Sequence, residues 1–310
     1  MPAIDLFQAF EDFNIRLNTL LFKKFDQYRF DFRSISKRYF DLLCGRYLPF
    51  LTDRVKLLYL SNNDETCDEI NYFLSHNLTF CQFANLQSLS ISDLRSENVM
   101  CQLLDECQHF QNLIHLKFKE CEFQHENMAI GQRLNNIWQL PKLTQCYLDI
   151  DLQEWRLKDK QLLCLPTIST PIQSLTIKVF NYKLNELVCI IAHAPYLRYL
   201  DVCAMDGIDK TPLNFPISSL TRLKITVHES PFIFGELLQN MPNLYHLTAD
   251  VSCIDLDGYQ WKRIIVNHLS KLKIFELRME LSPIERQHLN QMQASFRTHM
   301  KTQLSQKAQN

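Results

Sequence analysis

The residues best suited to chemistry in this chain are its histidines and cysteines. Ten histidines are scattered over 310 residues, and eleven cysteines occur without one Cys-x-x-Cys pair. The spacings of zinc sites and the Gly-x-Ser-x-Gly turn of serine hydrolases are absent. Cys189 and His193 could meet on one helix, but nucleophilic catalysis needs a third, orienting group that the sequence does not mark. We therefore expect no catalytic residues, no bound metal and no enzyme activity.

Glycine is too scarce for a nucleotide-binding loop. The chain has five glycines, none near another, whereas average usage would give about 22. Loops that cradle phosphate need clustered glycines, because the backbone must approach the phosphate closely. We therefore expect no nucleotide cofactor, and the sequence indicates no other cofactor.

Segment 23–39 interleaves basic and aromatic residues, a pattern that can bind single-stranded nucleic acid. The whole chain, however, has 33 basic and 34 acidic residues and a net charge of -1, so it has no overall field that would attract nucleic acid or an anionic membrane. Of the two readings, we favour a packed linker and expect neither nucleic acid nor a membrane as a partner.

The cysteine count and the hydropathy pattern bear on the compartment. The number of cysteines is odd, the N-terminal stretch is amphipathic rather than signal-like, and no apolar run approaches the roughly 18 residues of a membrane span. Reduced cysteines then serve as small apolar side chains. We expect a cytoplasmic or nuclear protein that is a monomer on its own.

A short pattern, Leu-x-x-Leu-x-Leu, recurs along the chain and outlines the elements that must position any site. Each copy ends in an alternation such as Leu89-Ser90-Ile91, which is typical of a short strand. Segments 65–75, 96–109, 183–193 and 259–269 lie between copies and have helical spacing, while the proline-containing 162–171 and 206–219 look non-helical. The nine copies begin at Val55, Leu86, Leu113, Leu143, Ile172, Leu197, Leu220, Leu244 and Leu272.

This pattern resembles the leucine-rich repeat, whose period is roughly 20–29 residues. The resemblance implies an α/β solenoid, or horseshoe, of about nine irregular repeats, with parallel strands on the concave face, helices on the convex face and helical caps at both ends. Asn63 and Cys121 occupy the family's usual Asn or Cys position after the strand, but Leu94 and Phe180 do not fit it. We therefore expect an irregular form, with the solenoid over 55–281 and a C-terminal cap helix and polar tail over 282–310.

Side-chain alternation predicts which residues line the concave face, because the leucines of each strand must face the core. The remaining strand positions mix basic, acidic and aromatic side chains, which suit protein recognition. A solvated strand face without a ligand would show the same residues, but concave solenoid faces usually bind partners. The candidate partner-binding residues are Tyr59, His115, Lys117, Lys119, Tyr147, Asp149, Lys178, Tyr199, Asp201, Arg222, Lys224, His246, Asp250, Glu276 and Arg278.

The N-terminal stretch carries a second resemblance. The sequences IDLFQAF at 4–10 and FNIRLNTLL at 13–21 look like the second half of an F-box, and the layout is similar to that of F-box proteins with leucine-rich repeats. The Leu-Pro start of the box does not precede the match. In that family the box docks on the Skp-type adaptor of a cullin–RING ubiquitin ligase, and the repeats hold the substrate.

Two interpretations of residues 1–22 follow. In the first, the segment is a partial F-box, and the chain is the non-catalytic substrate-recognition subunit of such a ligase. In the second, it is an N-terminal cap of a stand-alone repeat scaffold that no longer binds the adaptor, joined to the repeats by linker or cap helices over 23–54. The candidate adaptor-docking residues are Leu6, Phe7, Phe10, Phe13 and Leu17.

Overall fold

The computed structural model divides the chain into two compact units, Met1–Val179 and Phe180–Asn310. The residues that it describes are 28–33, 35–63, 68–123, 129–152, 171–183, 191, 194–205, 216–228, 231–252 and 258–280. The candidate docking residues between Leu6 and Leu17, the pair Cys189 and His193, and the expected C-terminal cap helix therefore lie outside the described residues.

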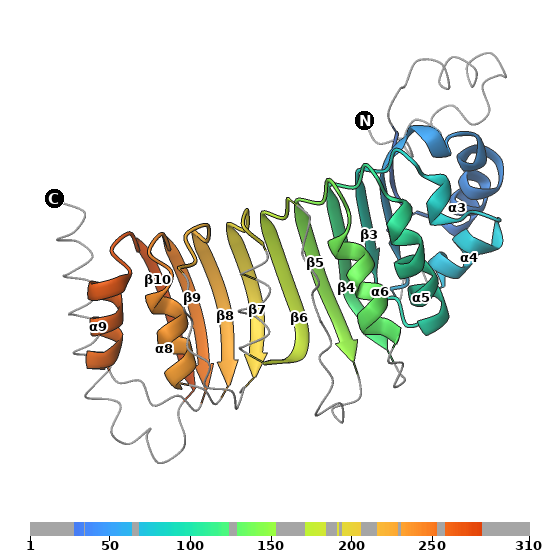
Figure 1. Cartoon of the computed structure of the whole chain (residues 1–310). Helices are drawn as coiled ribbons and strands as arrows, with labels where there is room; N and C mark the ends of the chain where they lie inside the picture. The colour runs from blue at the N-terminus through green and yellow to red at the C-terminus, as the bar shows by residue number, and fades with distance from the viewer. Residues whose placement is uncertain are drawn as a thin grey trace. The chain divides into compact units, whose positions relative to one another are not determined.

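The first unit alternates strands with short helices (Figure 1). Its helices are α3 (Lys37–Leu42), α4 (Glu69–Ser75), α5 (Glu97–Glu106) and α6 (Ala129–Trp138). A π-helical turn, η1 (Leu43–Tyr47), and the 3-10 turns η2 (Leu48–Phe50), η3 (Thr52–Arg54), η4 (Phe80–Gln82) and η5 (Cys107–His109) complete it. Its strands are β1 (Tyr28–Asp31), β2 (Val55–Ser61), β3 (Ser88–Ser92), β4 (His115–Phe123), β5 (Gln145–Leu152) and β6 (Ser174–Lys183), the last of which runs past the boundary.

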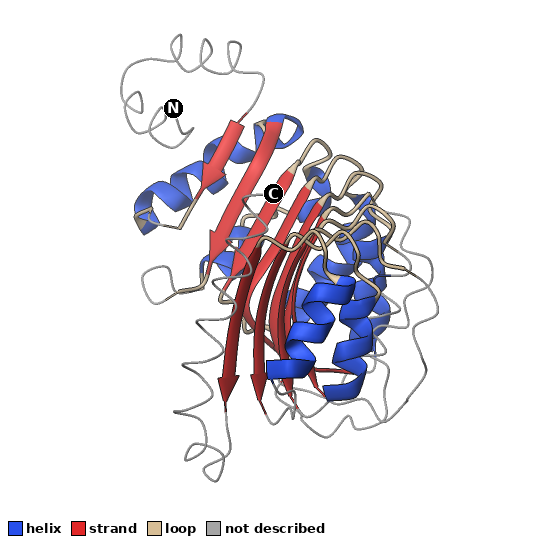
Figure 2. Ribbon diagram, turned by 90° about the vertical axis from the view of Figure 1, so that its left-hand side faces the viewer, coloured by secondary structure: helices blue, strands red, loops and turns tan. Residues whose placement is uncertain are grey.

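The strands of the first unit pair in chain order, and every pair is parallel. Parallel neighbours need a crossover connection, and here helices α4, α5 and α6 supply it on one face of the strands (Figure 2). The described part of this unit is thus a row of strand–helix repeats, each packed on the next.

The second unit repeats the same arrangement. Its strands β7 (Tyr199–Met205), β8 (Arg222–His228), β9 (His246–Ser252) and β10 (Ile274–Glu280) are parallel and also pair in chain order. Helices α8 (Pro231–Gln239) and α9 (Gly258–His268) connect β8 to β9 and β9 to β10. Proline at the first position of α8 costs that helix nothing, because the first backbone N–H groups have no partner inside a helix.

Burial follows the alternation that the repeat predicts. In β3, Leu89 and Ile91 are fully buried, and the same positions of β8, Leu223 and Ile225, are buried as well. The first leucine of each copy, such as Leu113, is also in the core. All nine predicted copies form strands, β2 to β10. The predicted fold class, a leucine-rich-repeat solenoid with parallel strands and helices on the other face, is confirmed within each unit.

The helical predictions have different outcomes. Segment 96–109 forms α5 and the turn η5, and 259–269 matches α9 within one residue at each end. Of 65–75, the described part forms α4, while most of 183–193 lies outside the described residues. Helices α6 and α8 were not predicted from the sequence.

Strand β1 is a tenth strand that the repeat pattern does not contain. It lies in the segment interpreted as a linker, and it pairs parallel to β2. Tyr28, Phe30 and Phe32 are buried, and their rings stack with centroids 6.1 and 5.6 Å apart. These rings belong to the basic and aromatic cluster that could have bound nucleic acid. Because they fill the core, they are not available to stack on bases.

A polar ladder joins successive repeats at the turns that precede the strands. The amide of Asn112 donates to the backbone oxygen of Ala84 over 3.1 Å, and Lys142 from the next repeat donates to Asn112 over 2.6 Å. Lys271 and Asn243 form the same step in the second unit, also at 2.6 Å. Each step satisfies a polar group that would otherwise be left at the packed edge of a repeat.

Candidate functional site

The polar face is defined here as the strand positions that alternate with the buried core residues. All fifteen candidate partner-binding residues are strand residues on this face, from Tyr59 on β2 to Arg278 on β10. The sequence therefore placed them on the correct side of the strands. Their role in binding stays a prediction.

A groove of about 600 Å³ crosses the polar face of the first unit. It is lined by residues from all six strands β1 to β6. Of the candidate residues, the groove brings together Tyr59, His115, Lys117 and Tyr147. Lys119, Asp149 and Lys178 lie on the same strands but are not part of its lining.

Strand register explains which residues meet in the groove. One row runs across β2 to β6 through Tyr59, Ser90, Lys117, Tyr147 and Thr176, each directly opposite the next. A second row lies two residues earlier and runs across β1 to β6 through Arg29, Leu57, Ser88, His115, Gln145 and Ser174. Neighbouring strands lie about 4.8 Å apart, so the groove is about 24 Å long from β1 to β6.

Small side chains on β3 make the groove hollow. The polar-face residues of this strand, Ser88, Ser90 and Ser92, are all serines, whereas the strands on either side carry Tyr59 and Lys117. Ser90 is only 7% exposed and forms part of the floor, as does Thr176 at 6%. The floor is therefore low and carries hydroxyl groups, while tyrosine and lysine side chains form its walls.

The charged groups of the groove have one sign. Arg29, Lys56 and Lys117 line it, together with His115, and none of the described residues that line it is Asp or Glu. Lys117 lies over the ring of Tyr147, with its Nζ 5.0 Å from the ring centroid, and it has no ion pair with a described carboxylate. The groove therefore presents cations and hydroxyl donors, which together favour an anionic ligand.

Asp31 is the carboxylate opposite Tyr59, at the β1 end, and its charge is already matched. Arg33 donates to it from Nε over 2.8 Å and from a terminal nitrogen over 2.5 Å. The same guanidinium lies 4.7 Å from the centroid of the Tyr59 ring. This bidentate pair keeps the Asp31 charge from cancelling the field of the groove cations.

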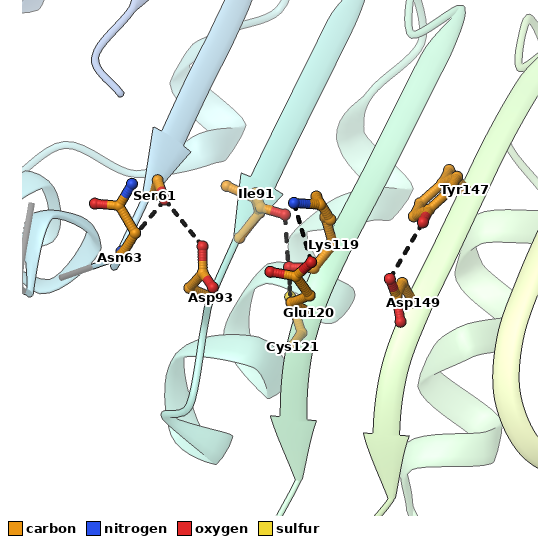
Figure 3. A network of polar contacts seen from close by, with 9 residues as sticks. All are labelled: Ser61, Asn63, Ile91, Asp93, Lys119, Glu120, Cys121, Tyr147 and Asp149. Atoms are coloured by element: carbon orange, nitrogen blue, oxygen red, sulfur yellow. Dashed lines mark hydrogen bonds and ion pairs between the residues drawn. The ribbon is translucent and has the colours of Figure 1, made fainter. Parts of the chain in front are cut away.

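On the carboxyl side of the groove, by contrast, acidic residues lie directly after β3 and within β4 and β5 (Figure 3). The Ser61 hydroxyl donates to Asp93 over 3.2 Å, and the Tyr147 hydroxyl donates to Asp149 over the same distance. Lys119 forms an ion pair with Glu120 at 3.0 Å. The hydrogen bond and charge of Glu120 raise the pKa of Lys119 above its ordinary value. Because the strands are parallel, these acids gather on the carboxyl side of the groove, and Asp149 comes closest to it through its bond to the groove residue Tyr147.

Two residues on this acidic side of the groove have left-handed backbone conformations. The φ angles of Asp93 and Glu120 are 58° and 53°. Around Glu120 the pairing of β4 with β5 is irregular between Phe118 and Cys121, as expected of a β-bulge. The bulge leaves Cys121 buried beneath the strand ends, with its Sγ 3.6 Å from the carbonyl oxygen of Lys119.

The polar face of the second unit carries charges of both signs in contact. Lys224 on β8 pairs with Asp201 on β7 at 3.4 Å, directly across the strands. Thr248 donates to Glu276 over 3.3 Å, and the same hydroxyl lies 3.3 Å from His246. Burial together with the charge of Asp201 raises the pKa of Tyr199. On this face, cations and acids therefore alternate between neighbouring strands, and Lys224 is neutralised by Asp201.

The described thiols are arranged for packing rather than nucleophilic chemistry. Burial raises the pKa of all five buried thiols above the ordinary value, that of Cys121 to about 12. A thiol that stays protonated at neutral pH is a weak nucleophile. These buried cysteines, which are free, are Cys44, Cys101, Cys107, Cys121 and Cys146.

Within the described part of the chain, no three His, Cys, Asp or Glu side chains gather as a metal ion would require. Among the described helices, none has the length and apolar character that crossing a membrane requires.

Comparison with known proteins gives a structural likeness but no sequence match. No family model and no curated protein matches the sequence. Among solved structures, a leucine-rich-repeat protein of Leptospira interrogans matches 78% of this chain with 16% sequence identity and a TM-score of 0.36. This chain spans 60% of the length of that protein. The class of protein, a leucine-rich-repeat solenoid, rests on the strands, burial and repeats of the chain itself.

Several residues of the groove were not among the sequence candidates. Arg29 was missed because β1 is not part of the repeat pattern, and Ser90 and Thr176 because a small hydroxyl residue gives no signal of its own. Leu57 lies on the polar face although leucines were assigned to the core. The available signal was that Leu57 directly precedes the core leucine Leu58, because consecutive residues of a strand point to opposite faces.

Proposed function

We propose that this chain is a non-catalytic protein-interaction module that holds a segment of a partner protein on the polar face of its first unit. The groove over β1 to β6 is the observation that supports this most directly. Its walls carry Tyr59, Tyr147 and cationic side chains, and aromatic and basic groups supply much of the binding energy in protein interfaces. A groove of that length suits an extended segment better than a compact small molecule.

A matched pair of tyrosines provides the test. Tyr59 lies in the groove, and Tyr72 is exposed on helix α4. Each is replaced in the full chain by a photoreactive phenylalanine analogue, and the chain is irradiated in the cell. We expect protein adducts from position 59 and few from position 72.

Competition makes the crosslinking result specific. Excess wild-type chain should suppress the adduct from position 59, while the groove-filling variant Ser90→Trp should suppress it poorly. Equal adducts from both positions, or equal competition by Ser90→Trp, would show that the groove does not hold the partner.

For the N-terminal residues we further propose the finer role that the F-box resemblance implies. Leu6, Phe7, Phe10, Phe13 and Leu17 would then dock on a Skp-type adaptor, making this chain a substrate-recognition subunit of a ubiquitin ligase. The support is the apolar spacing within 4–21. The alternative is a stand-alone scaffold in which the same residues cap the first repeat.

Co-purification separates these two roles. The full chain should retain the adaptor, and Phe7→Glu combined with Phe10→Glu should release it without unfolding the repeats. If the wild-type chain retains no adaptor while its thermal transition is intact, the stand-alone scaffold is the correct description.

A further inference from the structure

We propose that the groove of the first unit binds an extended acidic segment of a partner protein, with carboxylates seated on Arg29 at one end and Lys117 farther along. This inference rests on the proposed function and specifies the chemistry of the partner. It follows from three features of the described residues, namely the charge of the lining, the spacing of the cations and the position of the acids.

The charge of the lining selects an anion. Arg29, Lys56 and Lys117 have no ion pair with a described carboxylate, and the only carboxylate opposite the Tyr59 row, Asp31, is bound by Arg33. Like charges that line one hollow repel one another, and a bound anion relieves that repulsion. The hydroxyls of Ser90 and Thr176 add donors that a carboxylate can accept from.

The spacing of the cations fits a peptide in an extended conformation. Arg29 is on β1 and Lys117 is on β4, three strand spacings away. Three spacings across the strands and two residues along them correspond to about 16 Å, a separation that the side chains of two glutamates four residues apart in an extended chain can bridge. Residues i and i+4 of an extended peptide point to the same side. Two glutamates with that separation can therefore reach both cations from a single segment.

The position of the acids fixes where such a segment can lie. Asp93 directly follows β3, and Glu120 and Asp149 lie within β4 and β5, two or three residues past the row through Ser90, Lys117 and Tyr147 (Figure 3). They would repel an acidic ligand from that side of the groove and confine it to the part of the face that holds the groove cations. On the second unit, Asp201 already pairs with Lys224, and Asp250 lies opposite Arg278 on the neighbouring strand.

Binding of synthetic peptides to the purified full chain tests the inference. The probe is a peptide of about eight residues, long enough to cross the groove, with glutamates at positions i and i+4. Matched peptides carry glutamine or phosphoserine at both positions, and an oligouridylate of similar length represents RNA. We expect the glutamate peptide to bind at least about tenfold more tightly than the glutamine peptide, and to weaken as salt is added.

Paired variants locate the binding. The double variant Arg29→Glu, Lys117→Glu should lose about 100-fold in affinity for the glutamate peptide, since it reverses both contacts. The matched control, Arg222→Glu with Arg278→Glu, reverses two exposed cations on the second unit and should bind within about twofold of wild type. The milder variant Arg29→Gln, Lys117→Gln keeps the result interpretable if the charge reversal lowers the melting temperature.

Each contrary outcome has a distinct meaning. Equal binding of the glutamate and glutamine peptides, or equal losses in both double variants, would overturn the acidic assignment. Tighter binding of the phosphoserine peptide or of oligouridylate by more than about tenfold would overturn the choice of carboxylate ligand. If any of these results is found while the adduct from position 59 persists, this inference fails and the proposed function stands. Loss of the adduct would reject the proposed function instead.

Discussion

The polar faces of the two units are built from the same repeat but arrange their charges differently. In the first unit, Arg29 and Lys117 line a hollow whose described lining contains no acid, and the acids lie two or three residues farther along the strands. In the second unit, Lys224 is paired with Asp201 across neighbouring strands. The comparison teaches that the repeat positions side chains without deciding their function. Which face can attract a charged ligand depends on whether the opposing charges are adjacent or separated.

Filling the hollow should have the largest effect. Ser90→Trp puts a large side chain on the low floor between Tyr59 and Lys117, and we expect a loss of about 100-fold in affinity for the glutamate peptide. The matched change Thr248→Trp, on the polar face of β9, should leave that affinity nearly unchanged. Fluorescence anisotropy measures both, with circular dichroism to show that each variant is folded. Equal losses would mean that the hollow is not the binding site.

Two lysines on β4 allow a groove cation to be compared with a paired cation on the same strand. Lys117 lines the groove and has no described carboxylate partner, whereas Lys119 is paired with Glu120. Lys117→Gln should weaken peptide binding about tenfold, and Lys119→Gln by less than about twofold. Isothermal titration calorimetry can separate these values. A larger effect at Lys119 would place the ligand on the acidic side of the groove instead.

Alkaline pH should distinguish buried from exposed thiols in the first unit. Burial raises the pKa of Cys121 to about 12, so its neutral form stabilises the fold below the ordinary thiol pKa, and this contribution is lost as pH rises towards the folded value. Between pH 8 and pH 9.5 the loss is on the order of 1 kcal/mol. Chemical denaturation near pH 8 and pH 9.5 should show a smaller drop for Cys121→Ala than for wild type, whereas Cys81→Ala, at an exposed thiol, should match wild type.

The smallest expected effect is a gain of function in the second unit. If neighbouring acids prevent the polar face of the second unit from binding an anion, Asp201→Asn with Glu276→Gln should make the charge of Lys224 available to the peptide. Introduced into the Arg29→Glu, Lys117→Glu chain, these changes should raise the residual affinity for the glutamate peptide about threefold. No gain at low salt would indicate that charge balance alone does not separate the two faces.

The sequence predicted the scaffold better than the site. Leucines at a near-constant period, such as Leu89 and Leu116, must be buried, and this requirement determines both the strands and their polar sides. The groove depends on relations between strands. Ser90 matters because Tyr59 and Lys117 flank it, and the register that makes them neighbours is not readable from any one repeat.

Strand β1 is a second feature that the sequence did not predict. Its four residues, Tyr28 to Asp31, are too few to give a periodic signal, and the segment that contains them was interpreted as a packed linker rather than a strand. In the structure the aromatic side chains enter the core, and Arg29 faces the groove. Pairing with β2 aligns β1 with the other strands, so that its aromatic side chains stack on one another in the core.

The most direct test of the central claim is to map where the acidic peptide binds. The glutamate peptide carries a diazirine at the residue midway between its glutamates, and adducts on the full chain are located by mass spectrometry. The groove predicts adducts on β2 to β4, at residues 57–59, 88–90 and 115–117. Adducts concentrated on β7 to β10, or on helices α5 and α6, would contradict it.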